Sequence, residues 1–379
     1  MKITDIETVA IHYRGRDFVF VRVHTDEGLI GTGEGTLEGR ARTVQTAIHE
    51  LKDYLIGEDP LRIEHLWQIM YRHTFYRGGP LLMSAISGVD QALWDIFGKS
   101  VSLPVHQLLG GRVRDKIRVY ANGPRGETPE AIAESAIQIV EDGFTAMKLV
   151  PFRATKPLDG QTSIRFARDV MRAVRDAVGP DIELAVDSHG RLSPAMAITL
   201  GQAIKEYGIF FYEEPCLPEN VATMAAIARE CGIPVATGER LVSVWAFRDV
   251  LEKQAAVVIQ PDLAHCGGIS QGRKIAAMAE VYYAGFAPHN PLSPVNMRAS
   301  LHLDAATPNF VIQEWVWDDA GSIRDEILLN PVTIKDGWAE IPMEPGLGTD
   351  LNMDVCLANP ARGSHLPPFW HDDGSVADW

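Results

Sequence analysis

Residues 182–189, IELAVDSH, form an apolar run that ends in a carboxylate and an imidazole. Two later runs also end in carboxylates, FFYEEP at 210–215 and PVATGE at 234–239. Each run has the length of a buried strand, and helix-like segments separate them. Strands that alternate with helices pair in parallel, and their carboxyl ends then meet at one edge. The three runs therefore predict a parallel α/β sheet with acidic side chains at one edge.

The same alternation extends from about residue 116 to residue 325. The first helical segment shows the pattern: Thr128 suits the N-cap, Pro129 the first turn, and Gly143 the end. Repeated β-then-α units favour a modified TIM-type (β/α)7β barrel, with a doubly wound sheet as the alternative. The remaining predicted strands are KIRVYA (116–121), AMKLV (146–150), AAVVIQPD (255–262), YAGFAPHN (283–290) and VIQEW (311–315).

The chain before and after this repeat has a different pattern. Residues 1–115 begin with alternating runs and continue with helical patterns, which predicts a separate α+β capping domain. Residues 116–325 are the barrel, and 326–379 are a C-terminal segment that we expect to pack back on the capping domain. The stretch GTGEG at 31–35 resembles a dinucleotide loop, but GxGxxG would need glycine where Thr36 stands. Gly31, Gly33 and Gly35 are therefore expected to be turn or lid glycines.

Composition narrows the class of partner. The 379 residues are 46% hydrophobic and 22% charged, and the formal net charge is −15. The acidic charge and the lack of a basic tract argue against nucleic acid and anionic membranes. The N-terminus lacks a signal-peptide pattern and no run of 18 apolar residues occurs, so we expect a cytoplasmic protein with reduced cysteines. An anionic substrate would need a local cation.

One polar residue recurs at the end of each predicted strand from the third onward. Their separations are 26, 26, 23, 27 and 25 residues along the series Asp187, Glu213, Glu239, Asp262, His289 and Glu314. Converging carboxylates are unfavourable without a cation, and oxygen ligands suit Mg²⁺ first, with Mn²⁺ or Ca²⁺ next. We therefore predict that Asp187, Glu213 and Glu239 bind a metal.

Four side chains carry further candidate chemistry. Asp262 and His289 end adjacent strands, and a carboxylate against one imidazole nitrogen suits the other nitrogen to act as a base. Lys148 is expected to hold a substrate carboxylate, with a Schiff base or a solvent-facing lysine as alternatives. Side chains two apart on a strand share a face, so His189 should lie beside Asp187. The pair suits two ligands, a ligand beside a proton donor, a catalytic pair, or a structural contact.

The chain resembles the mandelate-racemase subgroup of the enolase superfamily across nearly its whole length. The residues that carry the resemblance are Lys148, VDSHGR (186–191), EEP (213–215), GER (238–240), QPD (260–262), APHN (287–290) and QE (313–314). Within the subgroup it is most similar to D-galactonate dehydratases and related sugar-acid dehydratases. That resemblance implies one Mg²⁺ per subunit, a small anionic sugar-acid substrate and a homo-oligomer.

The resemblance also implies roles. Asp187, Glu213 and Glu239 would bind Mg²⁺. His289, oriented by Asp262, would remove the C2 proton, and His189 would protonate the departing 3-OH to give a 2-keto-3-deoxy acid. Lys148 and Glu314 would lie against the substrate carboxylate.

Two departures restrict the activity. Racemases of the subgroup carry Lys-x-Lys, but Val150 stands where the second lysine would be, which disfavours racemisation. Mannonate dehydratases use an arginine and a tyrosine nearby, whereas the loop at 151–163 offers Arg153 and no tyrosine. The alternatives are an epimerase or cycloisomerase, a dehydratase of another acid sugar (mannonate, gluconate, arabinonate or an aldarate), a Schiff-base aldolase using Lys148, and a non-catalytic sugar-acid binder.

Overall fold

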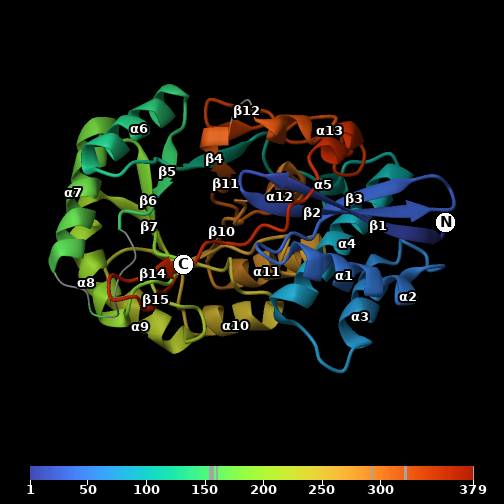
Figure 1. Cartoon of the computed structure of the whole chain (residues 1–379), viewed down its shortest axis with the longest axis horizontal. Helices are drawn as coiled ribbons and strands as arrows, with labels where there is room; N and C mark the ends of the chain where they lie inside the picture. Colours follow the sequence, from blue (N-terminus) through green and yellow to red (C-terminus); the bar gives the residue numbers. More distant parts are fainter. Residues whose placement is uncertain (153–157, 159–160, 292, 320–321, 379) are drawn as a thin grey trace.

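The N-terminal region pairs one antiparallel sheet with a set of helices. The fold was analysed in a computed structural model that describes residues 1–152, 158, 161–291, 293–319 and 322–378. The sheet has the order β1 (Ile3–Tyr13), β2 (Arg16–Thr25), β3 (Ile30–Glu34). It shares an apolar cluster with helices that lie with it on one side of the molecule (Figure 1): α1 (Ala41–Glu50), α2 (Lys52–Leu55), α3 (Ile63–Arg72) and α4 (Gly79–Ser100). The short helix α5 (Val105–Leu108) follows, and its Val105 packs in the barrel core. An α+β N-terminal region is confirmed.

The glycines of GTGEG allow helix α4 to approach strand β3. A Cβ on Gly31 would lie 2.0 Å from the carbonyl oxygen of Ala92, and a Cβ on Gly33 would lie 2.1 Å from that of Gly88. Both glycines lie inside β3. The expectation of turn or lid glycines is therefore wrong for these two, because close backbone packing is what requires them.

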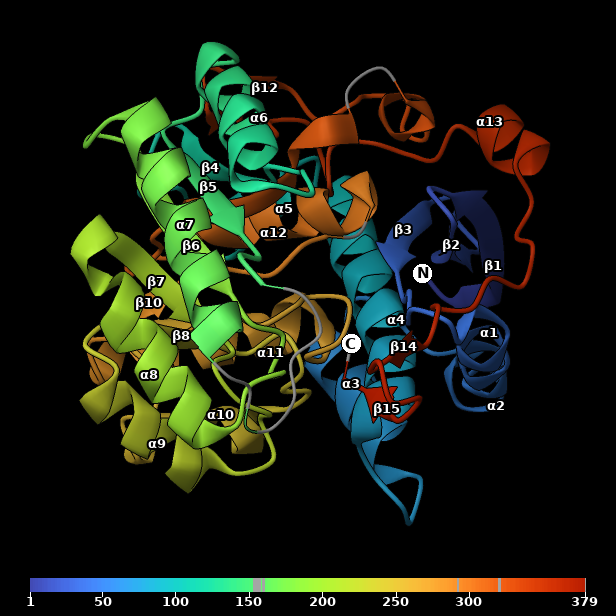
Figure 2. The ribbon, with the colours of Figure 1, turned by 60° about the vertical axis from the view of Figure 1, so that its left-hand side comes forward.

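Eight parallel strands follow, and helices cover their outer side (Figure 2). The strands are β4 (Ile117–Asn122), β5 (Ala146–Leu149), β6 (Glu183–Asp187), β7 (Ile209–Glu213), β8 (Val235–Thr237), β9 (Val258–Ile259), β10 (Gly285–Phe286) and β11 (Gln313–Val316). Strands β4 to β10 pair in chain order, and β11 pairs with β4. The backbone of Phe286 also bonds to Asn309 and Val311, just before β11. This circular pairing is the arrangement expected of the barrel.

The helices between the strands begin and end as the local sequence predicts. The Thr128 hydroxyl accepts a hydrogen bond from the Ala131 amide at 3.2 Å, Pro129 is the first helical residue, and Gly143 has φ +89°. The helices are α6 (Pro129–Glu141), α7 (Gln161–Val178), α8 (Pro194–Ile204), the 3₁₀ helix η1 (Lys205–Tyr207), α9 (Val221–Glu230), α10 (Val244–Glu252), α11 (Gly268–Val281) and α12 (Pro294–Ala306).

Strand alternation separates the barrel interior from the helix layer. Met147 and Leu149 of β5 belong to the large apolar core between strands and helices. Ala146 of the same strand packs inside the barrel with Tyr120 and Phe211. Because neighbouring residues on a strand point to opposite faces, Lys148 lies on the inner side.

The C-terminal segment contacts both parts of the chain. Ile327, Leu328 and Leu351 share an apolar cluster with Val9 and Ile11 of β1. Strand β13 pairs with β4, so part of the segment joins the barrel sheet instead. The division at residues 115 and 325 stays a prediction. The elements that follow β11 are η2 (Trp317–Asp319), η3 (Ile323–Glu326), β12 (Ile334–Lys335), β13 (Trp338–Ala339), α13 (Met353–Ala358), β14 (Phe369–Trp370) and β15 (Val376–Ala377). No helix in the described ranges is long and apolar enough to span a membrane.

Candidate functional site

The strand-end side chains meet at one cavity at the carboxyl end of the barrel. Asp187 and Glu213 are the last residues of β6 and β7, and Glu239 follows β8 by two residues. The cavity has a volume of about 200 Å³. Two of its lining residues, Arg16 and Glu38, come from the N-terminal region. The others come from the barrel: Asn122, Arg125, Lys148, Val150, Asp187, His189, Glu239, His289 and Pro291.

Lys148 lies among three carboxylates. Its Nζ is 3.0 Å from Glu213 Oε1, 2.9 Å from Glu314 Oε1 and 3.2 Å from Asp187 Oδ2. The side chain is 4% exposed, so the alternative of a lysine reaching solvent is wrong. Burial lowers its pKa, but Glu213 and Glu314 together raise the pKa well above the usual value. An ammonium held in this way is a poor amine nucleophile, which disfavours the Schiff base.

Glu213 is bonded on both carboxylate oxygens. Lys148 Nζ lies 3.0 Å from each oxygen, and Gln260 Nε2 donates to Oε2 at 2.8 Å. Burial, and then the charge of Asp187, raise the pKa of Glu213. One ammonium therefore does not offset the carboxylates around it, which is the electrostatic condition that a bound cation relieves.

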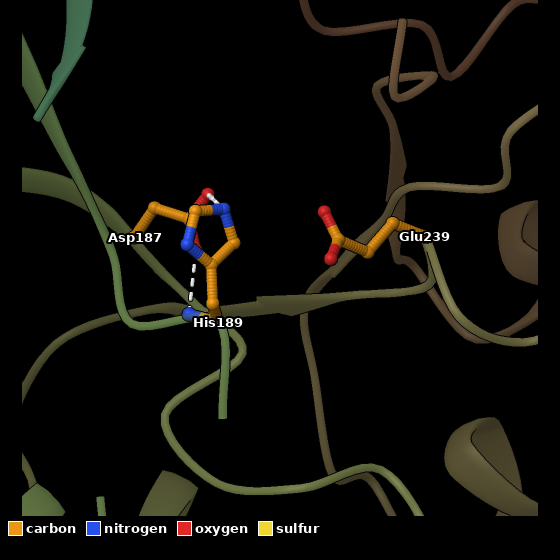
Figure 3. Close-up of side chains that lie close together, drawn as sticks. All are labelled: Asp187, His189 and Glu239. Atoms are coloured by element: carbon orange, nitrogen blue, oxygen red, sulfur yellow. Dashed lines mark hydrogen bonds and ion pairs between the residues drawn. The ribbon is translucent and has the colours of Figure 1, made fainter. Parts of the chain in front are cut away.

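Asp187, His189 and Glu239 form a second group of possible ligands. One ligand atom from each lies within 4.8 Å of the other two. Figure 3 shows Glu239 across from the Asp187–His189 pair, with the Glu239 carboxylate turned toward that pair. Asp187 Oδ2 and Glu239 Oε2 are buried oxygens that contact only nitrogens able to carry a positive charge: Lys148 Nζ and His189 Nε2 each lie 3.2 Å from the first, and His289 Nε2 lies 3.0 Å from the second. Buried carboxylates that converge in this way fit a hard divalent cation.

His189 lies beside Asp187 for a different reason from the one expected. Strand β6 ends at Asp187, and His189 has φ +48°, so it belongs to a left-handed turn and strand alternation does not apply. Its backbone amide donates to Asp187 Oδ1 at 2.9 Å, and its Nε2 is 3.2 Å from Asp187 Oδ2. The contact was correctly predicted, but the turn produces it.

Asp262 and His289 make the expected pair. His289 Nδ1 lies 2.8 Å from Asp262 Oδ2, and His289 Nε2 faces Glu239 Oε2 at 3.0 Å. Burial raises the pKa of Asp262, but His265 and the His289 hydrogen bond leave the pKa below its usual value. Burial lowers the pKa of His289, yet Glu239 and Glu314 raise it well above normal. A cation at Glu239 would offset that carboxylate and favour neutral imidazole.

Sequence reasoning missed a buried ion pair next to the site. Glu214, which follows Glu213 directly, is fully buried and has φ +38°. Arg240 Nε donates to Glu214 Oε2 at 2.7 Å. The arginine of GER was the available signal, because a buried carboxylate needs a partner.

Further contacts lie around these groups. Asn122 Nδ2 donates to Glu314 Oε1 at 2.7 Å, a contact that the sequence did not indicate. Nδ1 of His265, three residues after Asp262, lies 2.8 Å from the Ser84 hydroxyl. Arg153 lies outside the described residues.

Comparison with known proteins gives the same family for both parts of the chain. Residues 5–110 match the family model "Mandelate racemase / muconate lactonizing enzyme, N-terminal domain", and residues 131–355 match "Enolase C-terminal domain-like". D-galactonate dehydratases of Cronobacter sakazakii and Ralstonia pickettii are each 42% identical to the chain, over 100% of both proteins.

Solved structures show the same fold. A member of the enolase superfamily from Salmonella Typhimurium superimposes with a TM-score of 0.90 at 35% identity, covering 95% of this chain and 98% of that chain. A mandelate racemase/muconate lactonizing enzyme from Jannaschia sp. CCS1 gives 0.92 at 33% identity, covering 97% and 100%. The chain therefore belongs to the enolase superfamily, in the mandelate racemase/muconate lactonizing enzyme group.

Proposed function

We propose that this protein is a hydro-lyase that dehydrates a sugar acid, galactonate or a similar aldonate, to a 2-keto-3-deoxy acid. Relatives named D-galactonate dehydratase match the chain over its full length. One structural observation carries the proposal. Two imidazoles, His189 and His289, line the same cavity, and each lies against its own carboxylate. Elimination of water from a sugar acid needs one base and one acid in such an arrangement.

Asp187, Glu213 and Glu239 would hold one Mg²⁺. The convergence of the buried carboxylates of Asp187 and Glu239 on one cavity and the raised pKa of Glu213 support this choice. When bound, the ion would supply positive charge against the substrate carboxylate and against the dianion formed on proton loss. The alternative set replaces Glu213 with His189, because the latter lies within the second ligand group.

The protein's own residues would carry the proton transfers. Asp262 accepts from His289 Nδ1, which leaves Nε2 to take the C2 proton. His189 protonates the departing 3-hydroxyl, and Lys148 and Glu314 lie against the substrate carboxylate. An α-proton of a carboxylate is very weakly acidic, so electrostatic stabilisation must supply most of the rate increase.

The valine at position 150 favours elimination over racemisation. Val150 lines the cavity at the place where a second lysine would act as a base. A proton removed from one face would then have no base at this position to return it from the other. An epimerase or cycloisomerase remains the competing activity, and its product would have the mass of its substrate. A non-catalytic binder would bind sugar acids without turnover.

The proposal is tested with a panel of aldonates and aldarates, with product identification by mass and by the 2-keto group. The protein is treated with chelator, dialysed and assayed, then assayed again with Mg²⁺. We expect loss of product formation and its recovery with the metal. Full activity in the metal-free protein would contradict the Mg²⁺ proposal, and a product of unchanged mass would contradict dehydration.

A further inference from the structure

The loop that carries Asp262 is bonded along its length to helix α4 of the N-terminal region. Ser84, Ser87 and Gln91 recur at helical spacing, so they share one face of α4. The contacts from α4 to the loop are Ser84 Oγ to His265 Nδ1 (2.8 Å), Ser87 Oγ to the Gly267 amide (2.9 Å), Asp90 Oδ2 to the Ser270 amide (3.0 Å) and Gln91 Nε2 to the Leu263 carbonyl (3.0 Å). The N-terminal region thus holds the backbone of the loop that carries Asp262, the partner of His289.

Asn296 is the third residue of α12, and its side chain connects helix α4 to the Asp262 carboxylate. Its Oδ1 accepts from Gln91 Nε2 at 3.1 Å, and its Nδ2 donates to Asp262 Oδ1 at 3.0 Å. The Nδ2 also donates to Asn290 Oδ1 at 3.0 Å, and the backbone amide donates to Glu34 Oε2 at 3.0 Å. The side chain is fully buried, and all of its carboxamide donors and its acceptor are used.

The chemistry of Asp262 fixes the orientation of the Asn296 amide. An ionised carboxylate only accepts, so the NH₂ group must face it, and the amide oxygen must face Gln91. Asp262 Oδ1 also accepts from the Ala264 amide at 2.7 Å. These two bonds leave Oδ2 for His289 Nδ1 at 2.8 Å.

We propose that Asn296, held by Gln91, is a positioning residue for the His289 base, acting through Asp262. This inference rests on the proposed function. Loss of the Asn296 bond leaves the Ala264 amide as the remaining described donor to Oδ1, so rotation about the Cβ–Cγ bond is less restricted and Oδ2 faces His289 Nδ1 in a less fixed geometry. Outer-shell hydrogen bonds of this kind affect activity by about 10- to 100-fold.

The test uses near-isosteric apolar variants, Asn296→Leu and Gln91→Met, in the full-length protein with Mg²⁺. We expect kcat for dehydration to fall about 10- to 100-fold for Asn296→Leu, with KM changed by less than about twofold. Deuterium incorporation at C2 should fall by the same factor, because proton abstraction is the affected step. Gln91→Met should give a smaller loss in the same direction.

Ser300→Ala is the matched control. Ser300 lies one turn farther along α12, is fully buried, and its hydroxyl makes no hydrogen bond within the described chain. This variant should keep the wild-type kcat, whereas a general sensitivity of the helix would lower it. Near-ultraviolet circular dichroism and thermal unfolding check that each variant folds; if Asn296→Leu does not fold, Gln91→Met carries the test.

A double-mutant cycle separates positioning from a structural role. In an Asp262→Asn background, Asn296→Leu should cost almost nothing further, because its effect passes through the residue already changed. The same fold loss in both backgrounds would overturn the proposal, as would wild-type kcat in folded Asn296→Leu and Gln91→Met. A wild-type protein that dehydrates none of the sugar acids would instead refute the proposed function.

Discussion

Replacing His189 with asparagine should separate dehydration from C2 proton exchange. The backbone amide that bonds to Asp187 Oδ1 at 2.9 Å survives the change, and asparagine tolerates the left-handed φ of +48°. Only the imidazole, with Nε2 3.2 Å from Asp187 Oδ2, is lost. A general acid is worth about 10²- to 10⁴-fold, or about 3–5 kcal/mol of activation free energy. We expect dehydration to fall by that factor.

The assay follows 2-keto product and deuterium incorporation at C2 in deuterated water. Exchange should remain within about tenfold of wild type, since the base His289 is untouched. His65→Asn, an exposed histidine on α3, is the control and should change neither rate. Loss of exchange with His189→Asn would show that the roles of the two histidines are reversed. A large loss of Mg²⁺ affinity, measured by calorimetry, would show instead that His189 is a ligand.

Three further predictions concern stability. Burial raises the pKa of Glu34 to about 7, so between about pH 4.5 and 7 the folded protein holds a proton that the unfolded chain releases. The free energy of unfolding should therefore fall across that window by up to about 3 kcal/mol more in wild type than in Glu34→Gln, as measured by urea unfolding; equal slopes would contradict this. Arg240→Met leaves buried Glu214 unpaired and should cost about 3–5 kcal/mol in the same assay, and a cost near zero would refute the pairing. Gly33→Ala forces a Cβ against the Gly88 carbonyl oxygen, so its melting temperature should fall by several degrees; an unchanged value would refute the close packing.

The strand ends were predictable because one rule governs them. A parallel barrel presents the last residues of its strands at one mouth, so the spacing of Asp187 and Glu213 indicated the site before any contact was known. Alternation likewise put Lys148 inside the barrel. Asn296 could not be found in this way, because its partner Gln91 lies 205 positions earlier and joins it only when α4 packs on the barrel. Contacts between helix faces depend on tertiary packing that periodicity does not encode.

The charges at the mouth explain why an acidic protein would use a metal for an acidic substrate. Formal charge is −15 over the chain, and Lys148 is already committed to Asp187, Glu213 and Glu314. Its ammonium is therefore not a spare cation for a substrate carboxylate while those contacts persist. A divalent ion between the carboxylates would offset the local negative charge and weaken the ion pairs that Lys148 makes with them. The chelated protein should then bind sugar acids more weakly as well as fail to turn them over, and unchanged affinity without metal would place the anion-binding charge elsewhere.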